Sequence, residues 1–392
     1  MDVQTKRHPQ DFLWQGVCAY PFARQRPVGR GDSSMTVSVA DCSARTSRIK
    51  WARNAFIIFL LTLILLAAGT EIVFRYIILE SRRSIIESPG IPDIEQIQSN
   101  TFSTWRLLPN LKNVALKKYI VDGETRELPR EFVVSTNEYG YRGASLKPVG
   151  SRVRILTLGD STTFGLCVND SETWPFQLEK LLNEKAGFDL YEVVNAGTTG
   201  YTAYQALRRI DEWIALKPHV VVLSFGNNDR VCWDGISDIE RHRLTAALEP
   251  EAHGLRLFAF LRLKLFFMAR KADARPRLTS AEYLDCLEKM RSAFSKSGTR
   301  TICICWPQAS QIETPEQSPL YYQEALRKYC EEHAVPLVNP IPLFREAGIP
   351  LFYDSVHTNP AGCVLIAKLV AHSILQLEIS GLQEALAPSV PR

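Results

Sequence analysis

Two segments far apart in the chain have the residue types that nucleophilic catalysis requires. Ser161 follows an apolar run and precedes a helix-like segment, so its hydroxyl and backbone N–H can be exposed at a tight turn. His357 follows Asp354 closely enough for one loop to supply both a base and a carboxylate. Acyl transfer by serine needs that base within hydrogen-bond reach and that carboxylate to fix the imidazole tautomer. Ser161, Asp354 and His357 are therefore the candidate catalytic residues.

The other histidines of the chain lack such surroundings. They lie in the N-terminal segment, at the start of a predicted strand, in an irregular insert or on predicted helices: His8, His219, His242, His253, His333 and His372. Surface or packing roles are the default for histidines in these places. His357 is therefore the candidate base.

Two more loops carry residues that can stabilise a negatively charged oxygen. One begins at Asn195 and contains Gly197 and Gly200, and the other contains Asn228. A glycine lets the backbone approach a ligand closely, and an Asn amide is a neutral donor for a developing oxyanion. Taken singly, these loops and the turn at Ser161 also fit ordinary turns and helix caps. Each loop alone therefore leaves its role open.

Three of these segments lie where the strands of a parallel sheet are expected to end. From residue 152 onward, nearly continuous apolar strands alternate with helical stretches, as when helices cover both faces of a sheet. The predicted strands are residues 153–159, 191–197, 219–226, 301–306 and 336–340. The pattern predicts a five-stranded α/β domain with its ligand site beyond the carboxyl ends of the strands.

Together, the four segments resemble the successive sequence blocks of the SGNH (GDSL) hydrolase family, over residues 152–375. The family is named after the Ser, Gly, Asn and His of those blocks, and all four occur here in order. The resemblance implies a flavodoxin-like three-layer α/β sandwich with a five-stranded parallel sheet. It also implies that Ser161 is the nucleophile and that Asp354 orients His357, the base.

The same resemblance implies an oxyanion hole made by the backbone N–H groups of Ser161 and Gly200 and the side chain of Asn228. Of the two glycines in the second block, the spacing typical of the family favours Gly200. Asp160 and Asp229 are interpreted as hydrogen-bond acceptors that organise their loops. No metal and no cofactor is expected.

An apolar run near the N-terminus is the sharpest local feature of the sequence. Residues 55–69 carry no charge, and residues 72–74 extend the run to the length of about 20 residues that a bilayer requires. Glu71 would then lie near one interface. The sequence predicts one transmembrane helix over residues 53–78. A buried core helix and a signal peptide cleaved near Gly69 are the alternatives.

Charges on either side of this run favour one orientation. Four basic residues and a single acid precede it, whereas residues of both signs follow it. We therefore expect a single-pass membrane protein with a cytoplasmic N-terminus and a periplasmic or extracellular catalytic domain.

The rest of the chain divides around these features. Residues 1–50 lack a sustained period and are expected to form a disordered extension. Residues 80–148 combine a linker with a small β-rich segment, called the prelude below, whose stretch 135–143 is also similar to membrane-anchored bacterial SGNH hydrolases. The hydrolase domain is expected over residues 150–380, followed by a flexible tail, 381–392.

An insert at about residues 230–278 interrupts the strand and helix alternation. Its apolar and basic part, residues 255–267, is either a lipid-facing or substrate-covering element or a helix packed against the core.

Composition and cysteine usage exclude several functional classes. The net charge is +4, and the Lys and Arg residues are spread along the chain, so nucleic-acid binding is not expected. The nine cysteines include no C-x-x-C pair, which argues against a zinc ribbon or a thioredoxin motif. Cys303 and Cys305 share one face of a predicted strand, where packing is the expected role. A disulfide between Cys167 and Cys232 stays open for an exported domain.

Three functions fit these residues. Attack by water on an acyl-enzyme makes the protein an esterase or deacylase for O-acyl esters, which we favour. Attack by a sugar hydroxyl makes it an O-acyltransferase on a cell-surface glycan, which would need a partner protein to deliver the acyl donor. A non-catalytic membrane-tethered binding module on the same fold is the third. The expected partners are a small-molecule or glycan ester and the membrane, through residues 53–78.

Overall fold

The computed structural model describes residues 39–78, 98–99, 105–121, 124–232, 235–246, 254–269, 275–314, 320–348 and 350–377. The chain forms two compact units, Met1–Leu65 and Leu66–Arg392. The tail predicted at residues 381–392 and residues 1–38 of the predicted extension lie outside the described residues.

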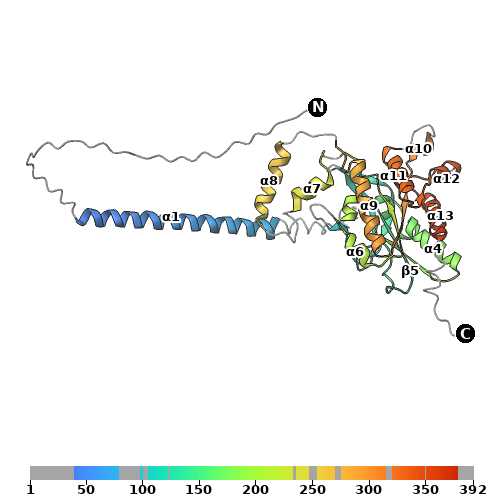
Figure 1. The fold of residues 1–392 in the computed structure, drawn as a ribbon, viewed down its shortest axis with the longest axis horizontal. Coiled ribbons are helices and arrows are strands. Elements are labelled where there is room, and N and C mark those ends of the chain that lie inside the picture. The colour runs from blue at the N-terminus through green and yellow to red at the C-terminus, as the bar shows by residue number, and fades with distance from the viewer. Residues whose placement is uncertain are drawn as a thin grey trace, which may run out of the picture. The chain divides into compact units, whose positions relative to one another are not determined.

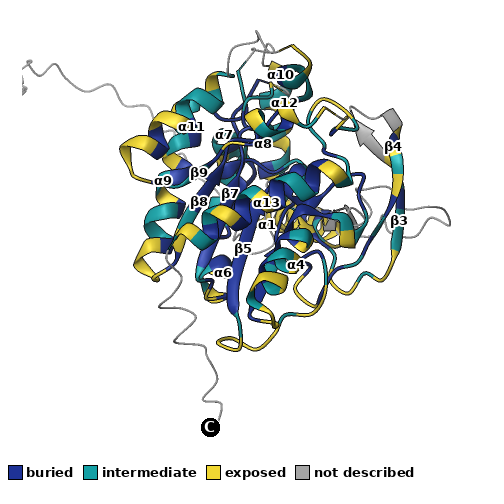
Figure 2. Ribbon diagram, turned by 90° about the vertical axis from the view of Figure 1, so that its right-hand side faces the viewer, coloured by how far each residue is buried: buried dark blue, intermediate teal, exposed yellow. Residues whose placement is uncertain are grey.

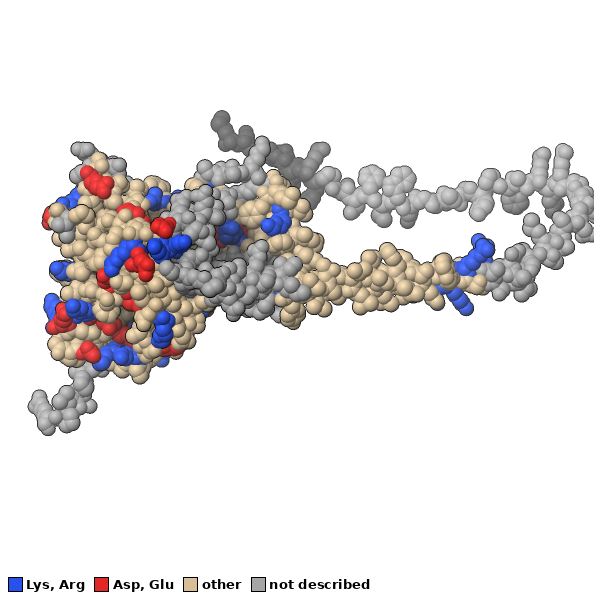
Figure 3. Space-filling model, turned by 180° about the vertical axis from the view of Figure 1, so that it is seen from behind, with Lys and Arg blue, Asp and Glu red and all other residues tan. Residues whose placement is uncertain are grey.

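The long helix α1 runs over Val39–Val73 and continues as a short π-helix, η1, over Phe74–Ile78. It contains a candidate membrane span, Arg45–Tyr76, whose most apolar window has a mean hydropathy of 2.5 and is 6% buried. Most of the helix carries neither acidic nor basic side chains (Figure 3). The core helix of a soluble protein is mostly buried, whereas α1 is mostly exposed. α1 therefore fits the alternative of a core helix poorly and is compatible with a single-pass membrane anchor.

α1 begins earlier than the sequence predicted. Its first residue, Val39, lies within the segment 1–50 that was expected to be disordered, and before the predicted start of the span at residue 53. Residues 39–52 contain no glycine or proline, so nothing in this stretch stops a helix that nucleates in the apolar run.

A five-stranded parallel sheet forms the centre of the second unit, as predicted (Figures 1 and 2). Its strands are β5 (Val153–Gly159), β6 (Tyr191–Asn195), β7 (Val220–Ser224), β8 (Arg300–Ile304) and β9 (Leu337–Val338). Their spatial order is β6-β5-β7-β8-β9, and each adjacent pair is parallel. This is the flavodoxin-like strand order, in which ligands bind beyond the carboxyl ends of the strands.

Helices cover both faces of this sheet. α4 (Trp174–Ala186) and α13 (Pro360–Gln376) lie on one face, and α9 (Ser280–Lys296) and α11 (Tyr321–Glu332) lie on the other (Figure 2). Shorter helices complete the unit: α3 (Ser161–Phe164), α5 (Ala203–Leu207), α6 (Ile210–Ala215), α10 (Ala309–Glu313) and α12 (Ile341–Glu346). A 3-10 turn, η2, spans Asp170–Glu172. The three-layer sandwich is thereby confirmed.

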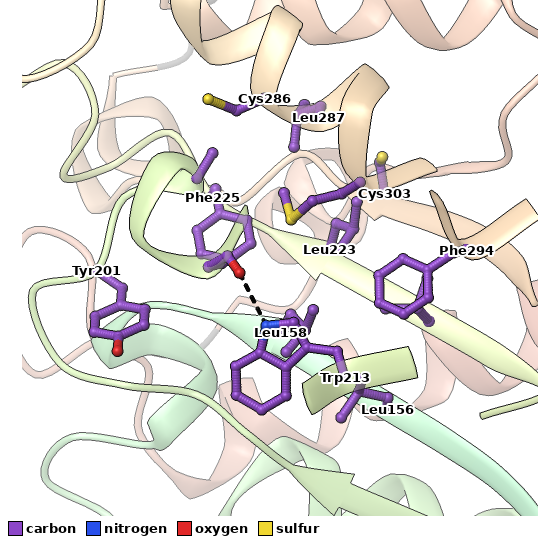
Figure 4. Packing of buried hydrophobic residues seen from close by; sticks show 14 of the residues in the cluster. Leu156, Leu158, Tyr201, Trp213, Leu223, Phe225, Cys286, Leu287, Phe294 and Cys303 are labelled. Carbon is purple, nitrogen blue, oxygen red and sulfur yellow. Dashed lines mark hydrogen bonds between the residues drawn. The ribbon is translucent and has the colours of Figure 1, made fainter. Parts of the chain in front are cut away.

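Successive strand residues pack into two different cores. Val220 and Val222 belong to the cluster under α4 and α13, whereas Val221 and Leu223 belong to the cluster under α9 and α11. Figure 4 shows the second cluster, in which the Trp213 indole also donates a hydrogen bond of 2.9 Å to the carbonyl of Ala206. Because side chains alternate across a strand, burial on both faces produces the continuous apolar runs seen in the sequence.

The prelude forms small antiparallel sheets. β1 (Gln98–Ser99) pairs with β2 (Arg106–Leu107), and β3 (Val114–Val121) pairs with the long strand β4 (Glu124–Val134). Leu116, Phe132 and Val134 are buried in a cluster that also contains Phe164, from the helix that begins at Ser161. The prelude is therefore packed directly against a predicted site segment.

In the described part of the insert lie the helices α7 (Asp238–Thr245) and α8 (Arg256–Ala269). In α8 only Ala259 is buried, while large apolar side chains such as Phe258 and Leu265 are exposed. The alternative of a helix packed against the core is therefore wrong. The reason is that α8 lies beside η1 and α7 and away from the sheet.

The cysteines in the described part of the chain form no disulfide. Cys303 and Cys305 are buried in one cluster, as their common strand face predicted. Cys167 is buried and Cys232 is exposed, and they are not joined by a disulfide.

Candidate active site

Ser161 lies at the turn between β5 and α3. The preceding residue, Asp160, caps α3 by accepting a hydrogen bond of 2.9 Å from the Thr162 N–H. A side chain at Gly159 is excluded, because its Cβ would lie 2.1 Å from Thr163 Oγ1 and 2.7 Å from the Ser224 carbonyl oxygen. This close packing makes the turn tight and places the Ser161 backbone N–H at the start of the helix.

The structure brings His357 and Asp354 to Ser161. His357 Nε2 is 2.8 Å from Ser161 Oγ, and His357 Nδ1 is 2.6 Å from Asp354 Oδ2. The other carboxylate oxygen of Asp354 accepts hydrogen bonds from the backbone N–H groups of Val356 and His357, at 2.9 and 2.8 Å. Hydroxyl, imidazole and carboxylate thus form one continuous hydrogen-bonded row.

The loop that carries His357 is held at both ends. The Tyr353 N–H donates 2.8 Å to the His357 carbonyl, and Asn359 caps α13 by accepting from the Gly362 N–H at 3.0 Å. Burial raises the pKa of Asp354, but the hydrogen bonds from His357 and Val356 outweigh it and lower that pKa to about 2. Asp354 is therefore ionised at neutral pH.

The two glycines of the loop after β6 have different roles. Gly197 packs against the backbone of α3, where a Cβ would lie 2.1 Å from the Phe164 nitrogen, and its N–H donates 3.1 Å to Asn195 Oδ1. Gly200 adopts a left-handed φ of +76°, and within the described structure its N–H has no acceptor. Of these two glycines, it is therefore Gly200 whose N–H can bind an external oxygen.

Asn228, in the loop that follows β7, lies beside the loop that carries Gly200. Its Nδ2 donates a hydrogen bond of 3.1 Å to the carbonyl of Tyr201, the residue after Gly200. This bond uses one of the two amide hydrogens and fixes the orientation of the side chain. The structure therefore brings the Asn228 amide to the Gly200 loop.

The two aspartates beside these residues organise their loops, as the sequence indicated. Asp160 Oδ1 accepts from the Thr162 hydroxyl at 2.7 Å in addition to the Thr162 N–H. Asp229 accepts from the Ala203 and Gly226 N–H groups at 2.9 and 2.8 Å, and so joins the second and third blocks. Both carboxyls are buried, and burial raises the pKa of each, that of Asp229 to about 7.

Arg142, in the prelude, is the main site-supporting residue that sequence reasoning missed. Its buried guanidinium donates to four backbone carbonyls at 2.6–2.9 Å, those of Val133, Phe164, Gly165 and Val168. It also pairs with Asp170 at 2.8 Å. Burial lowers the pKa of Arg142. Two of the carbonyls directly follow the Ser161 turn, so Arg142 holds that turn in place.

Two further residues hold the Gly200 loop, one from the prelude and one from the insert. Trp105 of the prelude donates 2.8 Å from Nε1 to the Thr199 carbonyl, and its ring would lie 3.0 Å from a Cβ on Gly200. Arg277 of the insert donates 2.7 Å to the Gly200 carbonyl and pairs with buried Asp238 at 2.9 Å. No local spacing marks either residue, because each acts on a loop distant in the sequence.

Among the described residues, no group of three or more His, Cys, Asp or Glu side chains is arranged to hold a metal ion.

Comparison with known proteins identifies related sequences and folds. A sequence profile of the GDSL-like Lipase/Acylhydrolase family matches residues 157–364. A GDSL-like lipase from Bacteroides thetaiotaomicron is 17% identical, over 59% of this chain and 92% of that chain, with a TM-score of 0.37. A member of the lipolytic protein G-D-S-L family from Veillonella parvula is 17% identical, over 57% and 97%, with a TM-score of 0.36.

A catalytic mutant of an acetylxylan esterase from Geobacillus stearothermophilus is 21% identical, over 58% of this chain and 96% of that chain, with a TM-score of 0.39. No curated protein sequence matches the chain.

Proposed function

The chain belongs to the GDSL-like lipase/acylhydrolase family and is a hydrolase that acts on ester bonds; on that premise we propose that it is a serine esterase or deacylase that cleaves O-acyl esters through an acyl-enzyme at Ser161. The observation that carries the proposal is the row of two hydrogen bonds from Ser161 Oγ to His357 Nε2 (2.8 Å) and from His357 Nδ1 to Asp354 Oδ2 (2.6 Å).

In the proposed first step, His357 removes the Ser161 proton as the hydroxyl oxygen attacks the ester carbonyl. Nδ1 of the imidazole donates to Asp354, which fixes the tautomer that leaves Nε2 able to accept. The imidazolium that forms is stabilised by the ionised carboxylate, whose pKa of about 2 keeps it charged at neutral pH. His357 then returns the proton to the leaving alcohol.

The proposed oxyanion hole consists of the Ser161 and Gly200 N–H groups and the second amide hydrogen of Asn228. Neither N–H has an acceptor in the part of the chain that the structure describes. Donors that are fixed before the reaction stabilise the tetrahedral intermediate without reorganisation. Water, activated by His357, then attacks the acyl-enzyme and releases the acid.

The test is hydrolysis of short-chain p-nitrophenyl esters by the purified full chain, together with labelling by a fluorophosphonate. Ser161→Ala is expected to abolish both, whereas Ser171→Ala, at an exposed serine outside the site, keeps both. Labelling without ester turnover would point to acyl transfer. Absence of both from a folded protein would refute the proposal and favour a binding module.

We also propose that α1 anchors the chain with its N-terminus in the cytoplasm and the hydrolase domain outside. The excess of basic residues before the span supports this orientation. Alkaline phosphatase fused to the C-terminus is expected to be active in cells, because that enzyme needs an oxidising compartment. The orientation would be overturned if the alkaline phosphatase fusion were inactive while a reporter that fluoresces only in the cytoplasm, fused at the same position, was fluorescent.

A further inference from the structure

α8 presents an apolar stripe to its surroundings. Five large apolar side chains along it and just before it are half exposed or more: Leu255 66%, Phe258 67%, Leu261 50%, Leu265 65% and Met268 81%. Their spacing of three or four residues places them on one side of the helix. Such a surface is costly in water, and it needs a partner.

The charge of α8 has a single sign. The helix contains Arg256, Arg262 and Lys264, and it contains no acidic residue. Arg262 and Lys264 are exposed beside the stripe. An exposed apolar stripe flanked by Lys and Arg is typical of helices that lie in the interface of an anionic bilayer.

The end of the candidate membrane span holds the start of α8. Both carboxylate oxygens of Glu71 accept 2.8 Å hydrogen bonds from the first backbone N–H groups of α8, at Arg256 and Leu257. Arg75 pairs with Glu71 at 2.6 Å and also donates to the Gly254 carbonyl. The sequence placed Glu71 among headgroups or water, but the structure uses it as a helix cap.

An apolar contact strengthens this attachment. Phe74, one turn after Glu71, is 2% exposed, and its ring centroid lies 5.2 Å from that of Phe260. Figure 1 shows α8 beside the C-terminal end of α1. The first turn of α8 is therefore fixed at the residues where the candidate span ends.

We propose that α8 is a second membrane element, which lies in the interface of the bilayer that α1 crosses, on the side of the hydrolase domain. This inference rests on the proposed membrane anchor. Its apolar stripe enters the boundary between headgroups and acyl chains, and Arg262 and Lys264 contact anionic headgroups. A bilayer is favoured over a protein partner because α8 begins at the end of the candidate span and the charged residues of the helix are all basic.

The attachment gives α8 a route to the active-site loops. α8 packs against α7, whose Asp238 accepts 2.7 Å from the Thr202 hydroxyl and pairs with Arg277. Arg277 in turn donates to the Gly200 carbonyl. The contact with α7 and the buried side chains of Asp238 and Arg277 thus link α8 to the loop proposed to bind the oxyanion.

The experiment is photo-crosslinking of the full chain in vesicles of phosphatidylcholine and phosphatidylglycerol. The photoreactive amino acid p-benzoylphenylalanine replaces Leu265 or Met268 in α8. Matched controls place it at Phe188 or Tyr321, which are 55% and 74% exposed on the hydrolase domain. Lipid adducts are expected to be severalfold more abundant at the two α8 positions than at the two controls.

A probe at Leu63, within the span, separates the two proposals. Adducts at Leu63 without adducts at the α8 positions would overturn the interfacial role of α8 and leave the anchor standing. Absence of adducts at all positions would overturn both. Crosslinks from α8 to protein, including a second copy of the chain, would also overturn the inference, because they would show another occupant of the stripe.

The charge of the helix provides a second test. Replacing Arg262 and Lys264 together by Gln is expected to lower the adduct yield at Leu265 severalfold in anionic vesicles and to leave it unchanged in phosphatidylcholine alone. Ester hydrolysis in detergent should stay at the level of the unmodified chain. An equal yield for both proteins in anionic vesicles would contradict the headgroup contact.

Discussion

The prelude and the helix α8 are both additions to the α/β domain, but they are attached in opposite ways. The prelude buries Leu116 and Phe132 against the segment that follows Ser161, and it inserts the Arg142 guanidinium among backbone carbonyls. α8 buries little and is fixed mainly at its first turn, by Glu71 and Phe74. The difference separates an element that completes the folded core from one that offers a surface to something else.

The largest expected effect concerns Arg142. Arg142→Ala should lower the free energy of unfolding by about 3–5 kcal/mol, because it removes a buried cation and its hydrogen bonds to Asp170 and to four backbone carbonyls. Denaturant unfolding of the full chain in detergent measures this loss. Arg106→Ala is the control in the same region, since its partly exposed pair with Glu212 is worth less than about 1 kcal/mol. Equal losses of unfolding free energy in Arg142→Ala and Arg106→Ala would contradict the structural role given to Arg142.

A second prediction concerns activity. Trp105→Phe keeps an aromatic ring beside Gly200 but removes the hydrogen bond to the Thr199 carbonyl. We expect kcat/KM to fall about tenfold, because the Gly200 N–H loses its fixed position, with little change in KM. Steady-state ester hydrolysis measures this. Trp51→Phe, at a 74% exposed position of α1, should leave kcat/KM unchanged.

A third prediction concerns the pH dependence of stability and the loop that carries Asp354. Tyr353 connects this loop to the prelude by accepting a 3.2 Å hydrogen bond from Arg130. The folded pKa of Asp354 is about 2, below the ordinary value of 3.8, so its ionised form stabilises the fold above pH 3.8. That contribution is lost as pH falls through 2. The difference in Tm between the unmodified chain and Asp354→Asn should therefore be constant above about pH 5 and shrink towards pH 2. A constant difference down to pH 2 would contradict it.

The smallest effect is expected in α8. Leu265→Ala, at a 65% exposed position, should change the free energy of unfolding in detergent by less than about 0.5 kcal/mol. Leu116→Ala, at a fully buried position of the prelude, should cost about 2–5 kcal/mol. The same denaturant titration measures both. A loss at Leu265 as large as that at Leu116 would show that α8 belongs to the folded core.

The sheet and the candidate active-site row could be predicted from sequence because their signals are local. Strands buried on both faces appear as continuous apolar runs, and the turn at Ser161 directly follows one of them. Asp354 and His357 share one loop, so their hydrogen bond needs no long-range information. The relation of Ser161 to His357, across 196 positions of sequence, followed from the family resemblance.

The supporting contacts could not be predicted, because they depend on side chains that meet backbone groups far along the chain. A guanidinium that binds carbonyls, as Arg142 does, leaves no complementary residue in the sequence to mark its partner. Glu71 caps a helix that begins 185 positions later. The start of α1 at Val39 was also missed, because polar helix-forming residues extend an apolar helix without a period of their own.

The Arg142 contacts also show that the bounds of the family profile differ from the bounds of the folded unit. The family profile begins at residue 157, inside β5, and ends at 364, inside α13. A polypeptide cut to that segment would retain Ser161, Asp354 and His357, yet the carbonyls of Phe164, Gly165 and Val168 would each lose the hydrogen bond from Arg142. The Phe164 and Gly165 carbonyls would keep weaker donors, Asn195 Nδ2 at 3.3 Å and the Val168 N–H at 3.4 Å. A buried group left without any partner costs about 1–3 kcal/mol. The segment that the family profile recognises is therefore shorter than the segment that must fold as one unit.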